Sequence, residues 1–197
     1  MSGDGLKIET SAESYFFELV HGAVENQKIV IKPETEFYVV KLLTRFIFSE
    51  SLYTKSSDGT LEDQPIAILY KEALEAEAPP IQKTLFQNVG DISLYKAGFF
   101  QESLNRSKID LDYYIGMGGS AYLNASKITD EKHFRSLFGE LADKFDRCVS
   151  LLLEVSEKTS ISSTKTETDI FRMYDLWSKT GSERAARVLK KSGIKVK

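Results

Sequence analysis

The chain has 197 residues, of which 42% are hydrophobic and 28% charged, and its formal net charge is −3. This length suffices for one domain with a sizeable core, and the composition is that of a globular protein. The near-neutral charge gives no global signal for nucleic acid or for an acidic membrane surface. The single cysteine, Cys148, excludes an intrachain disulfide and favours a reducing compartment.

Neither a targeting segment nor a membrane span is expected from the sequence. Residues 1–10 contain Gly and Asp without an apolar run, so they are unlike a signal peptide and predict a flexible tail. The longest apolar stretch, residues 37–48, is too short to cross a bilayer and is interrupted by Lys41 and Arg45. We therefore expect a cytoplasmic protein that does not bind a membrane.

The first part of the chain predicts two helices joined by a short connector. Ser11 or Ser14 can cap a first helix that ends near Asn26. Residues 27–32 are rich in β-branched residues but few, so we interpret them as a connector, with a strand as the alternative. Pro33, followed by two glutamates, fits the first turn of a second helix. Apolar residues on nearly all sides of this helix predict a central position in the bundle.

Prolines delimit the next two helices. Residues 55–65 are polar and contain Gly and Pro, as surface loops do. Residues 66–78 predict a third helix. The pair Pro79-Pro80 ends it and begins a fourth, because proline disfavours the helical conformation for the residue before it. The fourth helix extends over residues 81–100.

The second half of the chain contains the clearest helical pattern. Between residues 130 and 158, apolar residues recur every three or four positions with charged residues between them, which predicts one long amphipathic helix. We expect this helix to pack against the helix that begins at Pro33. Residues 159–166 are mostly Ser and Thr and predict a loop. A further helix is predicted over 167–179, and it resumes after a break and ends at Gly193.

These elements predict an all-α fold, a single-domain bundle of about six or seven helices. No internal repeat or long linker divides the chain, so we expect one helical domain over residues 11–193 and a basic C-terminal tail over 194–197. The glycine-containing segments 85–100 and 110–125 should form its tightly packed middle.

A glycine cluster offers a first hypothesis about function. Residues 116–121 fit the pattern G-x-G-x-x-A of dinucleotide-binding turns, and the residues before them alternate as a strand does. Such a turn belongs to a sheet of several strands, and no other strand pattern accompanies it. We therefore favour a helix over residues 110–125 whose small residues allow close packing, and we keep the nucleotide turn as the alternative. The candidate cofactor-binding residues are Gly116, Gly118, Gly119, Tyr113 and Tyr114.

Two carboxylate–histidine pairs offer a second hypothesis. Glu18 lies three residues before His21, and Asp130 three residues before His133, so on helices each pair shares one face. Di-iron bundles combine two Glu-x-x-His pairs with further glutamates, but here Asp130 resembles a helix N-cap and no further core glutamate is evident. We interpret both histidines as ordinary helix residues. Glu18 and His21 are kept as candidate metal ligands, with a haem held by His21 as a further alternative.

The remaining reactive or charged residues indicate packing and solvation. Cys148 lies near the apolar face of the long helix and is expected to be inert. Arg184, Arg187 and Lys191 share one side of a helix in the basic C-terminal region and can contact phosphate or an acidic partner. We favour a solvated face that suits the negative end of a helix dipole. Aromatic residues that would stack on bases are missing there, so nucleic acid is not an expected partner.

Two runs in the centre of the chain form a recognisable pair. The first is Gly-Asp-Ile-Ser-Leu-Tyr-Lys-Ala-Gly-Phe-Phe, beginning at Gly90, and the second is Asp-Tyr-Tyr-Ile-Gly-Met-Gly-Gly-Ser-Ala-Tyr, beginning at Asp112. Together, over residues 80–125, they resemble the signature of an uncharacterised family of all-helical bacterial proteins of similar length. The resemblance implies a bacterial cytoplasmic protein and implies no activity or catalytic residue.

The sequence favours a non-enzymatic regulatory or adaptor protein that acts through another protein or through self-association. The reason is a good predicted core without a coherent set of polar groups, so we expect no catalytic residue and no cofactor. The alternative is a helical protein, or an enzyme, that binds a small ligand or a cofactor such as haem, two metal ions or a nucleotide. A large exposed apolar patch would support the first hypothesis, and an internal pocket shared by the candidate residues would support the second.

Overall fold

The computed structural model describes residues 3–46, 54–55, 61–62, 64–99, 110–162 and 189. Within these ranges the chain forms seven helices and one short antiparallel pairing of two-residue strands, so the predicted all-α, single-domain class is confirmed. The strands are β1 (Thr54–Lys55) and β2 (Leu61–Glu62). The helices are α1 (Gly3–Gln27), α2 (Pro33–Phe46), α3 (Ile66–Glu75), α4 (Pro79–Phe99), α6 (Leu111–Ile128), α7 (Lys132–Asp143) and α8 (Phe145–Ser162).

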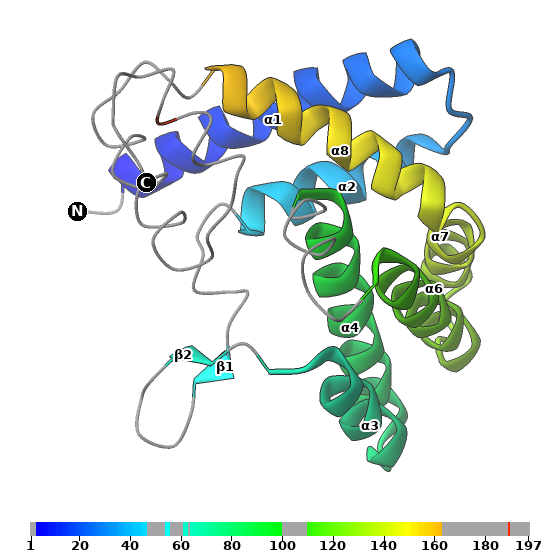
Figure 1. Ribbon diagram of the computed structural model, residues 1–197. Helices are drawn as coiled ribbons and strands as arrows, with labels where there is room; N and C mark the ends of the chain where they lie inside the picture. Colours follow the sequence, from blue (N-terminus) through cyan, green and yellow to red (C-terminus); the bar gives the residue numbers. More distant parts are fainter. Residues whose placement is uncertain are drawn as a thin grey trace.

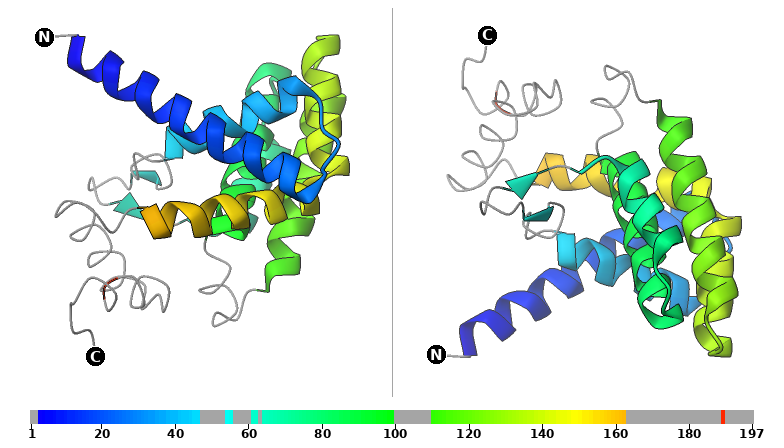
Figure 2. Two further views of the ribbon diagram at one scale, coloured as in Figure 1. Left: turned by 90° about the horizontal axis from the view of Figure 1, so that it is seen from above. Right: turned by 90° about the horizontal axis from the view of Figure 1, so that it is seen from below.

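Helix α4 lies in the middle of the bundle (Figure 1). It packs most extensively against α6, and it also contacts α2, α3 and α8. Helices α1 and α2 form an antiparallel hairpin, α8 lies beside α1, and α3 is at the opposite end of the molecule from α1 (Figure 1). Figure 2 shows the first turns of α1 extending past the other described helices.

The close contact between α4 and α6 depends on glycine. A Cβ atom at Gly90 of α4 would lie 2.6 Å from the ring of Tyr122 on α6, a separation that real Cβ atoms do not tolerate. A Cβ atom at Gly118 of α6 would collide with the ring of Phe145 and would lie 2.7 Å from the Cβ atom of Ser93. The prediction that the two glycine-containing segments form the packed middle is therefore confirmed.

Several predicted boundaries at prolines agree with the structure. Helix α2 begins at Pro33, α3 is followed by α4 beginning at Pro79, and residues 28–32 form the expected connector without a strand. The connector begins at Lys28, which has a left-handed φ of 53°. Its amide donates to the carbonyl of Glu25 while the amide of Ile29 donates to that of Val24, the pattern of a helix C-terminal motif that usually employs glycine.

The predicted start of the first helix is wrong. Helix α1 begins at Gly3, before Ser11 and Ser14, so residues 3–10 of the predicted tail belong to the helix. A short stretch that begins Gly-Asp-Gly gives little indication of a helix by itself, although it can continue a helix that is stabilised further along the chain. The flexibility predicted for residues 1–10 is a statement about motion and stays a prediction.

The prediction of one long helix from residue 130 is also wrong. The chain turns at Lys144 and forms α7 and α8 instead, and α8 then extends to Ser162 through part of the predicted Ser/Thr loop. No glycine or proline marks the turn, but the two halves differ in their main partners: α7 packs on α6 and α2, and α8 packs mainly on α4 and α1 and also contacts α6. The expected contact with α2 is made by α7, through Phe138 against Tyr38.

Other predicted elements lie outside the described residues. The helices expected after residue 166 fall in this part of the chain, except that Leu189 is described as a buried helical residue. The basic tail over 194–197 also lies outside the described residues. Among the described helices, none combines the length and the apolar character that crossing a membrane requires.

Two glycines of α6 allow a matched test of the packing. We expect Gly118→Ala to lower the free energy of unfolding by about 1–3 kcal/mol, because the added methyl group overpacks the contact with Phe145. Gly116 has nothing within 4 Å of its Cβ position, so Gly116→Ala in the same helix should raise the free energy of unfolding by about 0.5–1 kcal/mol. Urea unfolding measures both, and changes of the same sign would contradict the packing described above.

Candidate functional site

A fully buried carboxylate, that of Asp91, lies in the middle of α4. Its Oδ1 atom accepts hydrogen bonds from the hydroxyl groups of Tyr38 on α2 and Tyr122 on α6, each with an oxygen–oxygen distance of 2.6 Å. Its Oδ2 atom accepts a hydrogen bond from the guanidinium group of Arg45 on α2, also at 2.6 Å. Asp91 therefore links three helices through charge-assisted hydrogen bonds.

Burial governs the protonation of this cluster. Burial raises the pKa of Asp91, although the positive charge of Arg45 and the tyrosine hydroxyl groups act in the opposite direction. Burial, followed by the nearby Asp91 charge, raises the pKa of Tyr38 and of Tyr122 well above the ordinary value. For Arg45, burial alone would lower the pKa, but the Asp91 carboxylate raises it overall. The two tyrosines thus keep their protons and act as donors.

The Asp91 carboxylate is closed to a substrate. Both carboxylate oxygens already accept hydrogen bonds, and Asp91 and Tyr122 have no exposed surface. The side-chain amide of Gln87 donates to the hydroxyl oxygen of Tyr38 at 3.0 Å and completes the enclosure. A general acid or base has to lie within hydrogen-bonding reach of the substrate. The buried carboxylate therefore holds helices together and is out of reach of a ligand, whereas the Arg45 side chain reaches the surface with 46% of its area exposed.

Sequence reasoning gave Asp91 no role, although a signal was present. The residue lies between Val89 and Ile92 in a helix whose neighbouring residues are buried. A lone acid on such a face requires a partner in the folded protein. The identity of that partner depends on which helices pack together, and it could not be deduced from the spacing within α4.

The candidate metal ligands lie on the surface of α1. Glu18 and His21 are both exposed on α1. The Nδ1 atom of His21 lies 2.8 Å from a carboxylate oxygen of Glu36 on α2, and its Nε2 atom lies 3.6 Å from Glu25. In the part of the chain that the structure describes, no three or more His, Cys, Asp or Glu side chains are arranged to hold a metal ion. His21 instead connects α1 to α2.

The second histidine pair is separated by the end of a helix. His133 is exposed in the first turn of α7, whereas Asp130 precedes that helix. Glu131, and not Asp130, occupies the N-cap position, and its side chain makes no capping hydrogen bond. The pair therefore does not share one helix face as the spacing suggested.

The glycine cluster lies inside α6 and not at a strand-to-helix turn. Gly118 faces the core, whereas Gly116 is exposed, and Gly119 lies in ordinary contact with Phe145. Tyr114 is buried and Tyr113 is exposed, and their rings meet edge to face with the centres 5.7 Å apart. The favoured interpretation, a helix with small residues at its packing face, is the one that the structure has. Cofactor binding by these glycines and tyrosines belonged to the alternative interpretation, and it stays a prediction.

The other sequence candidates contribute no site among the described residues. Cys148 is buried in α8, and burial raises the pKa of its thiol to about 12, so the thiol stays protonated at neutral pH. This agrees with the expectation of an inert cysteine. The predicted phosphate or acidic-partner contacts, Arg184, Arg187 and Lys191, lie outside the described residues.

An open apolar groove runs between α1 and α2. Its volume is about 320 Å³, and it is lined by Glu13, Ser14, Phe17, Glu18, Phe37 and Val40. Phe17 and Phe37 leave 46% and 48% of their surfaces exposed, whereas Val40 is fully buried. Helix α2 buries most of its apolar residues as predicted for a central helix, but Phe37 departs from that pattern.

Polar contacts hold the two sides of this α1–α2 groove in place. The Nζ atom of Lys41 on α2 lies 2.6 Å from a carboxylate oxygen of Glu13 on α1 and 5.3 Å from the centre of the Phe37 ring. The ring of His21 stacks on that of Phe17, with the ring centres 5.7 Å apart. The hydrogen bond to Glu36, followed by the negative charge of Glu36, raises the pKa of His21.

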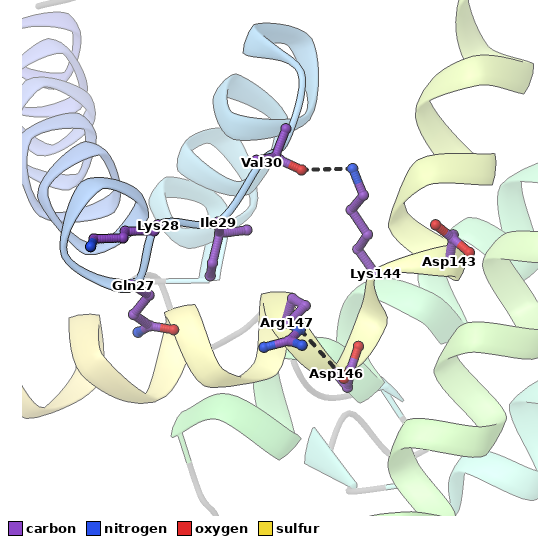
Figure 3. A pocket seen from close by; sticks show the side chains of 8 residues that line it. All are labelled: Gln27, Lys28, Ile29, Val30, Asp143, Lys144, Asp146 and Arg147. Carbon is purple, nitrogen blue, oxygen red and sulfur yellow. Dashed lines mark hydrogen bonds and ion pairs between the residues drawn. The ribbon is translucent and has the colours of Figure 1, made fainter.

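A second hollow, of about 520 Å³, lies where the α1–α2 connector meets the turn between α7 and α8 (Figure 3). Lys144 donates from Nζ to the carbonyl oxygen of Val30 and pairs with Glu140. Arg147 lies 3.9 Å from Asp146. Because these two cations are engaged and the lining is mostly polar, this hollow is a weaker binding surface than the α1–α2 groove.

Comparisons with protein-family models, with curated proteins and with solved structures find no match to this chain. Its function therefore has to be argued from the geometry and the chemistry of its surface.

The Asp91 cluster predicts a large effect of a single substitution. Asp91→Ala should lower the free energy of unfolding by about 3–5 kcal/mol, because it removes the shared acceptor of the Tyr38 and Tyr122 hydroxyls in the interior and the ion pair with the half-exposed Arg45. Tyr38→Phe removes one of the three donors to the carboxylate, together with the acceptor of the Gln87 amide, and should lower the free energy of unfolding by about 0.5–1.5 kcal/mol. Urea unfolding followed by circular dichroism gives both values. A smaller loss for Asp91→Ala than for Tyr38→Phe would contradict the central position of the carboxylate.

The contact between His21 and Glu36 predicts a dependence on pH. Because the pKa of His21 is raised in the folded protein, its bond to Glu36 stabilises the fold below the ordinary pKa of 6.5, and this contribution is lost as the pH rises through the folded-state pKa. Glu36→Gln should return the pKa of His21 toward its ordinary value. Titration of the His21 ring resonances by NMR tests this expectation, and an unchanged pKa in the variant would contradict it.

Proposed function

We propose that the protein is a non-enzymatic adaptor or regulatory protein that binds another protein through the α1–α2 groove. The observation that carries this proposal is the pair of half-exposed aromatic side chains, Phe17 and Phe37, beside an open groove. Contiguous exposed apolar surface on a folded chain commonly marks a binding site. Aromatic residues are also enriched at the centres of protein–protein interfaces.

The location of the titratable groups supports a binding role over a catalytic one. Among the described residues, Asp91, Tyr122 and Cys148 are buried and have raised pKa values. Groups with perturbed pKa values often mark active sites, but structural ion-pair networks perturb them as well. Here they stabilise the interior, whereas the exposed feature is apolar, which favours contact with another protein.

The shape of the groove also favours a protein over a small ligand. Small ligands are usually enclosed on most sides, whereas this groove is open along the surface of two helices. The residues considered for a small ligand are also dispersed, with His21 on α1 and Tyr113 on α6. Among the described residues, no specific contact favours the small-ligand alternative. We expect the protein to bind its partner in the cytoplasm of a bacterium, as the sequence resemblance implies.

Paired substitutions can test the proposal in cells of the natural host. We expect Phe17→Ser combined with Phe37→Ser to lower the amount of one or more co-purifying proteins by about tenfold or more, because interface aromatics carry much of the binding energy. The matched control is Ile68→Ser combined with Ile81→Ser, which alters two exposed apolar residues of α3 and α4. Quantitative mass spectrometry of proteins that co-purify with each tagged full-length chain measures the difference.

Folding and self-association need to be checked in the same experiment. Both double variants should retain the circular dichroism spectrum of the original chain, because the substituted side chains are exposed. Sedimentation shows whether the protein retained by the groove is a second copy of the chain. Identical sets of co-purifying proteins for the original chain and both double variants, with no change in sedimentation, would contradict the proposal.

A further inference from the structure

We propose that the segment bound in the α1–α2 groove is a basic amphipathic helix of another protein, an inference that rests on the proposed function. Helix α1 and helix α2 already pack as neighbours, and the groove between them exposes Phe17 and Phe37. An amphipathic helix laid into such a groove buries apolar residues spaced one turn apart. Recognition of this kind needs no enclosed cavity, in agreement with the open shape of the groove.

The charges around the groove indicate that the bound segment is positively charged. Two carboxylates, Glu13 and Glu18, line it, and two more, Glu25 and Glu36, lie against the His21 ring that stacks on Phe17. Lys41 and His21 are the cationic groups in direct contact with this set. These four carboxylates outnumber the two cationic groups, so the set carries a net charge of −2 with His21 protonated and −3 with His21 neutral. Negative charge is thus concentrated at this surface.

Glu18 is the carboxylate that is available to a partner. Glu13 is bound to Lys41, and Glu36 to His21. Glu18 is exposed and, among the described residues, makes no hydrogen bond or ion pair. A Lys or Arg side chain next to an apolar anchor of the bound helix can pair with it. Phosphate groups of a nucleic acid or an anionic lipid surface would instead be repelled by the four carboxylates.

Two synthetic peptides of about 18 residues, or five helical turns, can test the inference. Both carry the same apolar residues at helical spacing, and they differ only in having Lys and Arg or Glu at the remaining positions. We expect the basic peptide to bind the full-length chain and to shift the NMR resonances of α1 and α2. Fluorescence anisotropy should show that its affinity falls as the salt concentration rises, because the attraction is electrostatic. The acidic peptide should not bind.

Charge reversal of Glu18 provides the matched variant. We expect Glu18→Lys to weaken binding of the basic peptide by about five- to tenfold, which is the range for a charge at the edge of an interface. The control is Glu75→Lys on α3, at the opposite end of the molecule (Figure 1), where the side chain is 65% exposed and paired with Lys71. It makes the same change in net charge and should leave the affinity unaltered.

The outcomes separate this inference from the proposed function. The inference is overturned if the basic peptide does not bind, if both peptides bind equally, or if the shifted resonances lie away from α1 and α2. It is also overturned if both charge reversals weaken binding alike. A natural partner that is lost from the Phe17 and Phe37 variant but is retained by Glu18→Lys would leave the proposed function standing while rejecting a basic helix as the bound segment.

Discussion

The buried carboxylate of Asp91 constrains how α2, α4 and α6 pack together. A carboxylate removed from water requires charged or polar partners, and losing one partner of such a group commonly costs about 3–5 kcal/mol. Here α2 supplies two donors, Tyr38 and Arg45, which are seven residues apart and therefore lie two turns apart on one face. Helix α6 supplies the third donor, Tyr122, whose ring fits against α4 only because Gly90 lacks a side chain. The position of one charge thus determines the register of three helices.

Helix α2 contributes side chains both to the buried Asp91 cluster and to the α1–α2 groove. Tyr38 reaches the carboxylate from the buried side of α2 and the half-exposed Arg45 reaches it from the surface, while Phe37 and Lys41 lie toward solvent beside α1. The polar interior fixes the position of the α1–α2 hairpin, while the outer face of the hairpin is left with an apolar groove and an excess of carboxylates. A rigid support of this kind is what a binding surface needs, because a preorganised surface loses less conformational entropy when a partner docks. Structure in the interior and recognition on the surface are therefore connected through one helix.

The sequence alone was sufficient for the fold class and for the elements that proline and glycine delimit. Pro33 and Pro79 begin helices because of a local backbone preference, and the small residues of α6 indicate close packing directly. The break at Lys144 could not be deduced, since residues on both sides of it continue one amphipathic pattern and only tertiary contacts distinguish α7 from α8. The groove was missed for a similar reason: α2 is apolar on most of its sides, so no pattern shows that Phe37 is the residue left exposed. The role of Asp91 likewise depends on donors that are distant in the sequence.

Native-state hydrogen exchange of the full chain tests most directly the claim that Asp91 lies in a closed structural core. We expect the amides around Asp91 in α4 and Tyr122 in α6 to be among the slowest to exchange, with an opening free energy equal to that of global unfolding. These amides should become exposed only when the whole bundle unfolds, because α2, α4 and α6 are held by the same carboxylate. Exchange of the Asp91 region through a local opening of much lower free energy, while α1 and α2 stay protected, would contradict this account. That result would indicate instead an interior that opens to solvent, as a buried ligand site requires.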